Sequence, residues 1–439
     1  MNENDRKILH IALPAIVTNI TVPLLGLVDT AIVGHMGEAA YMAAIAVGSM
    51  IFNLVYWVFG FLRMGTSGLT AQAWGRHDVG EVRRLLWRSV LVALATALFL
   101  WLLQGPLCQL MLWLIGPTAE VRPLAVDYYR IVVWGAPAVL GLYSLSGWFI
   151  GMQNTRLPMV VSILQNVANI LVSLVLVYGL HMKVEGVALG TVIAQYVGLA
   201  TGVLLMFRYY GRLRLLRIPF PKMHELVPFL RVNRDIFLRT LSLVAVNLYF
   251  TSVGARQGAA ILAVNTLLMQ LYLLFSYVMD GFAFAGEALG GRYWGASNVA
   301  VYRQVVRRLF GWGALVTCLF TAVYVVGGMP FLRLLTDEPQ VVEAAREYVW
   351  WAWLVPAAGV TAFVWDGLFI GTTQTRAMLW SACLAAFVFF VAVILLLPLL
   401  GNHGLWLAML LYLLTRGLVQ TLCYRHKMWY VVRRNNVEL

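Results

Sequence analysis

The chain has 439 residues, of which 61% are hydrophobic and only 12% are charged, and its mean hydropathy is +0.80. Soluble proteins carry roughly 25% charged residues, so this composition excludes a soluble globular protein and indicates one that crosses a membrane several times. The net charge of +13 does not indicate nucleic-acid binding, because the basic residues flank apolar segments.

Apolar segments of about 20 residues, the length that crosses a bilayer, follow one another along the chain. The sequence before His10 is polar and too short for a signal peptide, so we expect the first segment to be retained. We predict twelve membrane helices, at 10–33, 43–71, 86–104, 127–150, 158–180, 186–207, 235–255, 260–285, 309–328, 346–370, 378–400 and 404–423.

The first apolar segment carries an acid, Asp29. An ionised Asp at bilayer depth is costly and normally faces a bundle interior or a water-filled cavity. Pro14 and Pro23 each remove a backbone hydrogen bond, so this helix can bend. We predict that Asp29 is a proton or cation site on a bendable helix.

The basic residues predict the orientation. Of the 32 Lys and Arg, we place 24 at the termini or in loops after even-numbered segments, the latter including Arg239, and six on the opposite side of the membrane. By the positive-inside rule both termini are cytoplasmic. Arg63 and Arg416 fall within segments, and for Arg63 we favour a snorkelling or paired role.

The sequence repeats itself with an offset of 220 residues. Gly34 matches Gly254, Trp74-Gly75 matches Trp294-Gly295, and 147–156 matches 367–376. Six segments precede each equivalent point, so the two halves have the same orientation, as in transporters built from parallel repeats. We predict two six-helix lobes, 1–215 and 216–439, joined by the basic cytoplasmic segment 208–234.

Three further acids, Asp280, Glu287 and Asp366, lie within apolar sequence near the predicted cytoplasmic ends of their segments. Two interpretations stay open. In the first, these acids form a second ion or gate site. In the second, nearby arginines neutralise them in structural ion pairs, and the candidates are Arg63, Arg292 and Arg376.

Neutral polar residues interrupt the fifth and sixth segments. Such residues either join helices through hydrogen bonds or, beside a buried carboxylate, tune its pKa. The residues are Gln165, Asn166, Asn169, Ser173, Thr191 and Gln195. The four cysteines are far apart without CxxC spacing, which indicates neither a disulfide framework nor a metal site.

Four stretches of the sequence resemble the multidrug and toxic compound extrusion (MATE) family, and more narrowly its DinF branch. They are residues 22–35, 166–170, 185–195 and 277–287. The resemblance covers essentially the whole chain. It implies a twelve-helix, two-lobed antiporter that exports cationic or amphipathic compounds by alternating access, driven by protons or sodium.

The resemblance also implies roles for single residues. Asp29 matches the first-helix acid, Pro14 the proline at which that helix bends, and Asn169 and Thr191 the acid's polar partners. Asp366 falls on the tenth helix, where sodium-coupled relatives carry a cation-binding acid. Many relatives have an Asp at the position of Ser173. Because hard cations favour several carboxylate and carbonyl oxygens, its absence favours proton coupling over sodium coupling.

We expect protonation of Asp29 to bend the first helix and expel the drug outward. The cavity is expected to be lined by aromatic, Met and small polar residues, which suit varied lipophilic cations. Its candidates are Met50, Asn53, Tyr56, Trp57, Tyr143, Met159 and Gln165. We expect no metal or cofactor beyond the coupling ion, and a monomer in a bacterial inner membrane.

Three alternatives bear on this interpretation. A flippase for lipid-linked precursors would line its cavity with Arg or Lys for pyrophosphate, whereas few basic residues lie inside the segments. A membrane enzyme would need a catalytic motif, and the sequence contains no HExxH, GxSxG or GxxxxGK. A receptor or channel fits the composition, but the repeat favours a transporter.

Overall fold

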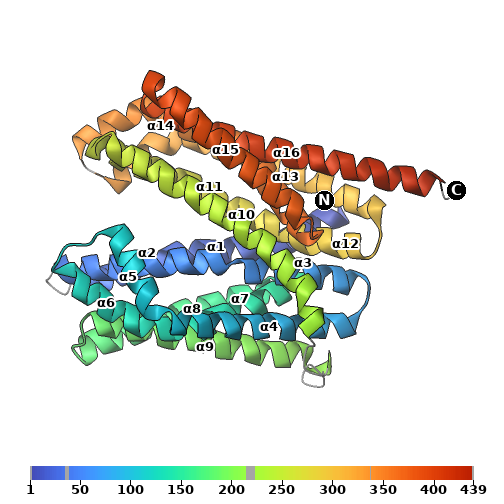
Figure 1. Ribbon diagram of the computed structural model, residues 1–439, viewed down its shortest axis with the longest axis horizontal. Helices are drawn as coiled ribbons and strands as arrows, with labels where there is room; N and C mark the ends of the chain where they lie inside the picture. Colours follow the sequence, from blue (N-terminus) through green and yellow to red (C-terminus); the bar gives the residue numbers. More distant parts are fainter. Residues whose placement is uncertain (1, 35–38, 214–222, 337, 438–439) are drawn as a thin grey trace. The chain divides into compact units, whose positions relative to one another are not determined.

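The computed structural model describes residues 2–34, 39–213, 223–336 and 338–437, apart from the side chains at 22–27, 29–31, 33, 223–224, 334 and 429–437. The described chain consists of helices joined by short turns and contains no strand (Figure 1). Every apolar segment predicted from the sequence forms helix.

The described residues of the first half of the chain form nine α-helices and three short 3-10 or π turns. They are α1 (Glu3–Gly34), α2 (Ala39–Phe59), α3 (Phe61–Gly75), α4 (Val79–Leu102), α5 (Gln104–Ile115), α6 (Val121–Val132), η1 (Val133–Gly135), α7 (Ala136–Gly151), α8 (Arg156–Leu174), η2 (Val175–Gly179), α9 (Val184–Tyr210) and η3 (Gly211–Leu213).

The second half uses longer, less interrupted helices. They are α10 (Met223–Arg256), α11 (Ala259–Ala285), the π turn η4 (Gly286–Gly290), α12 (Gly291–Gly295), α13 (Val299–Leu335), α14 (Pro339–Gly371), α15 (Thr375–Leu400) and α16 (Asn402–Val437).

Within the described residues, 11 helical stretches are long and apolar enough to cross a membrane. They correspond one to one to the second through twelfth predicted segments. The first predicted segment lies within α1, part of whose side chains lie outside the described residues. The expected all-helical membrane fold is confirmed.

The repeat of 220 residues is visible in the helix caps. The Asp78 side chain accepts a hydrogen bond from the Glu81 backbone N–H at 2.8 Å at the start of α4, and Asn298 accepts one from Val301 at 3.1 Å at the start of α13. Such caps satisfy N–H groups that have no partner within the helix. Non-glycine residues with positive φ also recur at this offset, namely His77 with Ser297 and Gln153 with Thr373.

Two glycines at the same offset allow close helix packing. A Cβ at Gly147 of α7 would overlap the carbonyl oxygen of Arg63 in α3, and a Cβ at Gly367 of α14 would overlap that of Ala283 in α11. Small residues let helix backbones approach in this way. Each half is therefore assembled around an equivalent close contact between two helices.

The chain forms two compact units, 13–233 in one and 1–12 with 234–439 in the other. We call them the N-terminal and C-terminal units. These bounds differ from the predicted lobes, because residues 1–12 hydrogen-bond to α12 and α13 and the first turns of α10 pack with the N-terminal unit. Asn4 donates to Gln304 at 3.3 Å, whereas Arg88 of α4 donates to Glu225 at 2.9 Å.

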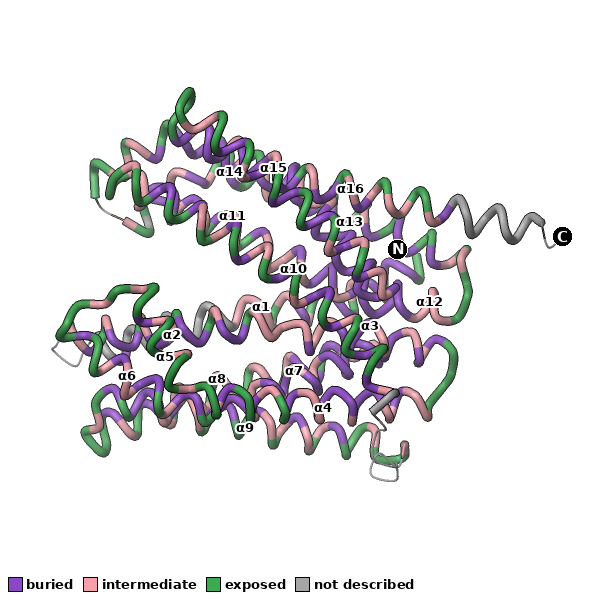
Figure 2. The backbone as a smooth tube through the Cα atoms, viewed as in Figure 1, coloured by how far each residue is buried: buried purple, intermediate pink, exposed green. Residues whose placement is uncertain are grey.

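Each unit has its own apolar core, and many large hydrophobic side chains are nevertheless exposed. Buried and exposed positions alternate along the helices (Figure 2). The most apolar stretch of α14 is 78% buried, so it is the central helix of the C-terminal unit, whereas that of α13 is only 22% buried. An apolar helix exposed to this degree is typical of a lipid-facing position.

Candidate functional site

Helix α1 runs through Pro14 and Pro23 without interruption. Proline removes one backbone hydrogen bond from a helix, and next to Pro14 the Thr18 hydroxyl donates to the Pro14 carbonyl at 3.0 Å. The Asp29 and Pro23 side chains lie outside the described residues. Their roles in ion coupling and bending stay predictions.

Two side chains of α8 hold the middle of α1. The Asn166 amide donates to the Thr21 carbonyl at 3.2 Å, and the hydroxyls of Ser162 and Thr21 are 3.1 Å apart. Asn166 thus contacts the backbone of α1 two turns before Asp29. Its hydrogen bond fixes the position of the helix that carries the acid.

A hydrogen bond joins Asn169 of α8 to Thr191 of α9, and their predicted role as partners of Asp29 stays a prediction. The Asn169 amide donates to Thr191 Oγ1 at 3.2 Å, and Thr191 donates onward to the Val187 carbonyl at 3.0 Å. Asn169 Oδ1 and Ser173 Oγ are buried and have no hydrogen-bond partner among the residues whose side chains the structure describes. A buried polar atom without a partner is costly, so this site favours a water, a proton or another polar group.

The polar character of this site is confined to the N-terminal unit. At the offset of 220 residues, positions 29, 169 and 173 correspond to Tyr249, Phe389 and Val393. The rings of Tyr249 and Phe389 are in edge-to-face contact, with centroids 6.3 Å apart. The equivalent place in the C-terminal unit is therefore filled by apolar packing.

The candidate cavity residues do not form one surface. Met50, Asn53 and Trp57 share an exposed face of α2, whereas Tyr56 is buried with its ring 5.5 Å from that of Phe52. Tyr56 therefore packs within the core of the N-terminal unit, and the predicted role of these residues in drug binding stays a prediction. The partly buried Tyr143 packs against this same core.

Two more cavity candidates lie on α8. Gln165 packs against the backbone of α9 at Gly198, and Met159 is partly buried. Gln165 thus faces the neighbouring helix.

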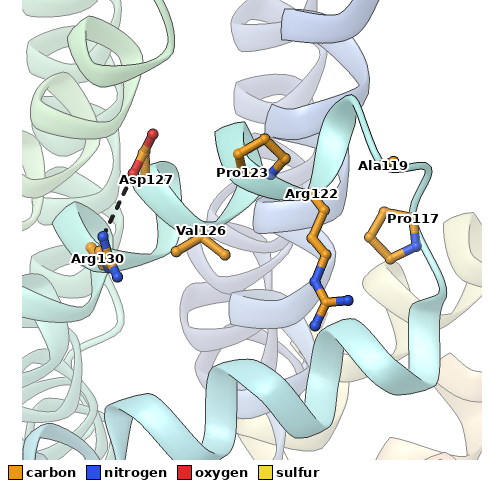
Figure 3. Close-up of a pocket in the computed structure, with 7 residues that line it drawn as sticks. All are labelled: Pro117, Ala119, Arg122, Pro123, Val126, Asp127 and Arg130. Carbon is orange, nitrogen blue, oxygen red and sulfur yellow. Dashed lines mark ion pairs between the residues drawn. The ribbon is translucent and has the colours of Figure 1, made fainter.

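A cavity of about 590 Å³ lies at the predicted outer end of the N-terminal unit (Figure 3). Asp127 and Arg130 face each other there at 3.9 Å, while Arg122 extends away from both. The cavity contains none of the predicted site residues. Its lining residues are Pro117, Ala119, Arg122, Pro123, Val126, Asp127 and Arg130.

Asp366 lies at the centre of a buried ion-pair cluster in the C-terminal unit. Its Oδ2 accepts hydrogen bonds from Arg239 of α10 and, at 2.6 Å, from Arg416 of α16. Its Oδ1 accepts one from Gln420 at 2.7 Å. Both carboxylate oxygens are therefore engaged by protein donors, as in a structural ion pair.

The partners of Asp366 differ from those expected. The sequence offered Arg63, Arg292 or Arg376, and Arg239 was assigned to a cytoplasmic loop. The structure instead places Arg239 inside α10, where it is 5% exposed. The helical spacing of Arg239 with the buried Val246, Phe250 and Val253 is the signal that identifies it as inward-facing.

The other two C-terminal acids lie on α11 and on η4. Asp280 is partly buried, and Glu287 is 1% exposed within the π turn. A Cβ at Gly371 would lie 2.6 Å from the Glu287 carbonyl oxygen, so α14 packs closely against this turn. Among the described residues no group of His, Cys, Asp and Glu has the arrangement of a metal site.

Comparison with known proteins follows the same two-part pattern. Residues 14–175 and 236–396 match the family model described as MatE. DNA damage-inducible protein F of Escherichia coli K12 is 39% identical over 421 residues, which cover 95% of this chain and 91% of that protein. The chain belongs to the MatE family. The resemblance to MATE transporters of the DinF branch is thus confirmed.

Other relatives of the MatE chain are more distant. A probable multidrug resistance protein NorM of Thermotoga maritima is 27% identical over 354 residues, covering 78% of this chain and 75% of that protein. A crystal structure of a MATE transporter in the bent conformation superposes with a TM-score of 0.87 at 19% identity, covering 99% of this chain and 97% of that one. This MATE chain is therefore a membrane transporter of a multidrug efflux family.

Proposed function

We propose that the protein is a secondary active antiporter that exports cationic or amphipathic organic compounds across a bacterial inner membrane by alternating access. Both termini are cytoplasmic, and the working unit is a monomer. Family membership and the two-part fold support the transport class. The basic loops support the orientation.

Protons are the coupling ion in this proposal, with Asp29 as the carrier. The observation that carries it is the contrast between the two units. In the C-terminal unit both oxygens of Asp366 are occupied by protein donors. In the N-terminal unit Asn169 Oδ1 and Ser173 Oγ are neutral and have no partner among the described side chains. A sodium site favours several oxygen ligands that include carboxylates, and Ser173 supplies none, so the sodium-coupled alternative is less well supported.

Coupling follows from the position of α1. Protonation of Asp29 from the outside removes the charge that polar neighbours stabilise, and the helix then bends near Pro14. Residues 1–12 belong to the C-terminal unit and Leu13 begins the N-terminal unit. A bend at Pro14 therefore falls where α1 passes from one unit to the other. In this proposal the bend changes the shape of the drug cavity expected in the N-terminal unit, while the start of the helix stays fixed.

The flippase alternative needs free cationic side chains for a pyrophosphate. Arg239 and Arg416 are buried cations, but Asp366 engages both. The structure therefore gives this alternative no specific support.

The proposal is tested by uptake of a fluorescent cation into inside-out vesicles. We expect Asp29→Asn to abolish uptake at normal expression, because the residue can no longer release a proton. Collapsing the pH gradient should stop wild-type uptake, and collapsing the sodium gradient should not. Asp127→Asn, which alters an exposed pair with Arg130, is the control. Unchanged uptake in Asp29→Asn, or dependence on sodium alone, contradicts the mechanism.

A further inference from the structure

A cavity of about 670 Å³ lies in the C-terminal unit between the N-terminal segment and the first turns of α13. The N-terminus lies beside α13 (Figure 1). The cavity contains none of the residues assigned to ion coupling or drug binding. Its lining residues are Asn2, Asp5, Gln304, Arg307, Arg308, Gly311, Trp312 and Leu315.

Hydrogen bonds of the N-terminal segment build the wall of this cavity. The Asp5 carboxylate accepts a hydrogen bond from Trp312 Nε1 at 3.2 Å and lies 3.6 Å from an Arg308 guanidinium nitrogen. Asn4 donates to the Gln304 side-chain oxygen at 3.3 Å, which leaves the Gln304 amide hydrogens for another acceptor. Asp5 is itself 7% exposed. The wall is therefore a fixed part of the fold.

The cavity carries an excess of positive charge. Two guanidinium groups, those of Arg307 and Arg308, line it together with the single carboxylate of Asp5. Among the described residues Arg307 forms no ion pair, whereas Arg308 pairs with Asp5. Arginine binds phosphate through planar, bidentate hydrogen bonds. The chemistry of the cavity is that of an anion site.

An apolar stripe continues from the cavity along α13. Gly311 and Leu315 line the cavity, and Leu315, Leu319, Val323 and Val326 are each more than half exposed. Steps of three or four residues keep these positions on one helix face. Trp312 lies at the junction, and Trp is enriched at membrane interfaces. Charged at one end and apolar over several turns, this surface has the polarity of a phospholipid.

We propose that this surface binds one anionic phospholipid of the cytoplasmic leaflet. Its phosphate contacts Arg307, Arg308 and the Gln304 amide, and an acyl chain lies along the stripe from Leu315 to Val326. Basic pockets at the cytoplasmic ends of membrane helices bind such head groups. The proposed orientation places this end of α13 at the cytoplasmic side, and the site is independent of Asp29.

The test measures phosphatidylglycerol binding to the purified full-length protein in neutral detergent by native mass spectrometry, with phosphatidylcholine as the neutral lipid. Arg307→Gln should weaken phosphatidylglycerol binding by about five-fold, because one Arg near anionic lipid contributes about 1 kcal/mol. Arg308 is left intact, since its loss would also release Asp5. Arg333→Gln, at the other end of α13 and exposed, is the matched control and should bind as the wild type does.

Three results would overturn the proposal. The first is equal binding of phosphatidylglycerol and phosphatidylcholine. The second is binding of phosphatidylglycerol by Arg307→Gln as strong as that of the wild type. In the third, inorganic phosphate at the lipid's concentration displaces it fully, which would identify the ligand as free phosphate. Drug uptake by Arg307→Gln vesicles is measured in parallel. Loss of lipid binding with retained proton coupling separates this site from the mechanism at Asp29.

Discussion

Asp366 accepts hydrogen bonds from three side chains that come from two other helices. Arg416 also donates to the Tyr412 hydroxyl at 3.4 Å and lies 5.9 Å from the centre of the Phe363 ring. Charges taken out of water need such close partners, because removing one partner leaves the other uncompensated. In the C-terminal unit this acid connects α10, α14 and α16.

We expect Asp366→Asn to destabilise the protein, because Arg239 and Arg416 would stay buried without their carboxylate. Breaking a buried pair costs roughly 3 to 5 kcal/mol, to be measured as the change in unfolding free energy in detergent. Asp127→Asn should cost less than about 1 kcal/mol, since the Asp127 and Arg130 side chains are 49% and 73% exposed. Full stability of Asp366→Asn with a changed sodium dependence would instead assign Asp366 to cation binding.

At the level of helices, the paired glycines determine how closely neighbouring backbones approach. Gly147 and Gly367 each face a carbonyl oxygen of the adjoining helix. Gly327 in α13 has no atom within 4 Å of the position that a Cβ would take. Glycine is thus required for close packing at positions 147 and 367, whereas at position 327 there is room for a side chain.

We expect Gly147→Ala and Gly367→Ala each to cost about 1 to 3 kcal/mol, as overpacking of a close contact does. Gly327→Ala should be neutral or stabilise by up to about 1 kcal/mol, because Ala is the better helix former. Thermal unfolding of the three purified variants compares them directly. Equal behaviour of all three would show that the helices adjust without cost.

The helices and their repeat could be predicted because hydropathy and glycine spacing are local signals. The ion pair of Arg239 with Asp366 could not, because it joins residues 127 positions apart. Arg239 was counted with the basic loop residues because it lies only four positions into the predicted segment 235–255, but α10 begins at Met223 and places it well inside the helix. The burial of Tyr56 likewise depends on its contact with Phe52.

At the scale of the whole molecule, the two units share an architecture but differ in their buried polar groups. The N-terminal unit contains the hydrogen bond of Asn169 with Thr191, and the C-terminal unit contains the cluster around Asp366. Positions 239, 366 and 416 correspond in the first repeat to Asn19, Ser146 and Tyr196. Each half therefore lacks the other's charged or polar centre, which supports a division of roles.

The proposed orientation predicts a simple labelling pattern. In a chain whose four native cysteines are replaced, we expect R122C to react with a membrane-impermeant maleimide on intact cells. R303C should react only after the membrane is opened. Both native arginines are exposed, so accessibility within the protein does not limit either reaction. The reverse pattern would place the termini outside.

Because residues 1–12 belong to the C-terminal unit, the chain cannot be expressed as two complete units by a single cut between α9 and α10. A fragment that starts at Met223 would lack the acid that contacts Arg308 and Trp312, even though it carries every later helix. Co-expression with the fragment that ends before Met223 should restore the cavity wall at α13, because that fragment supplies residues 1–12. A chimera of two homologous proteins should fold only when residues 1–12 and the C-terminal unit come from the same homologue.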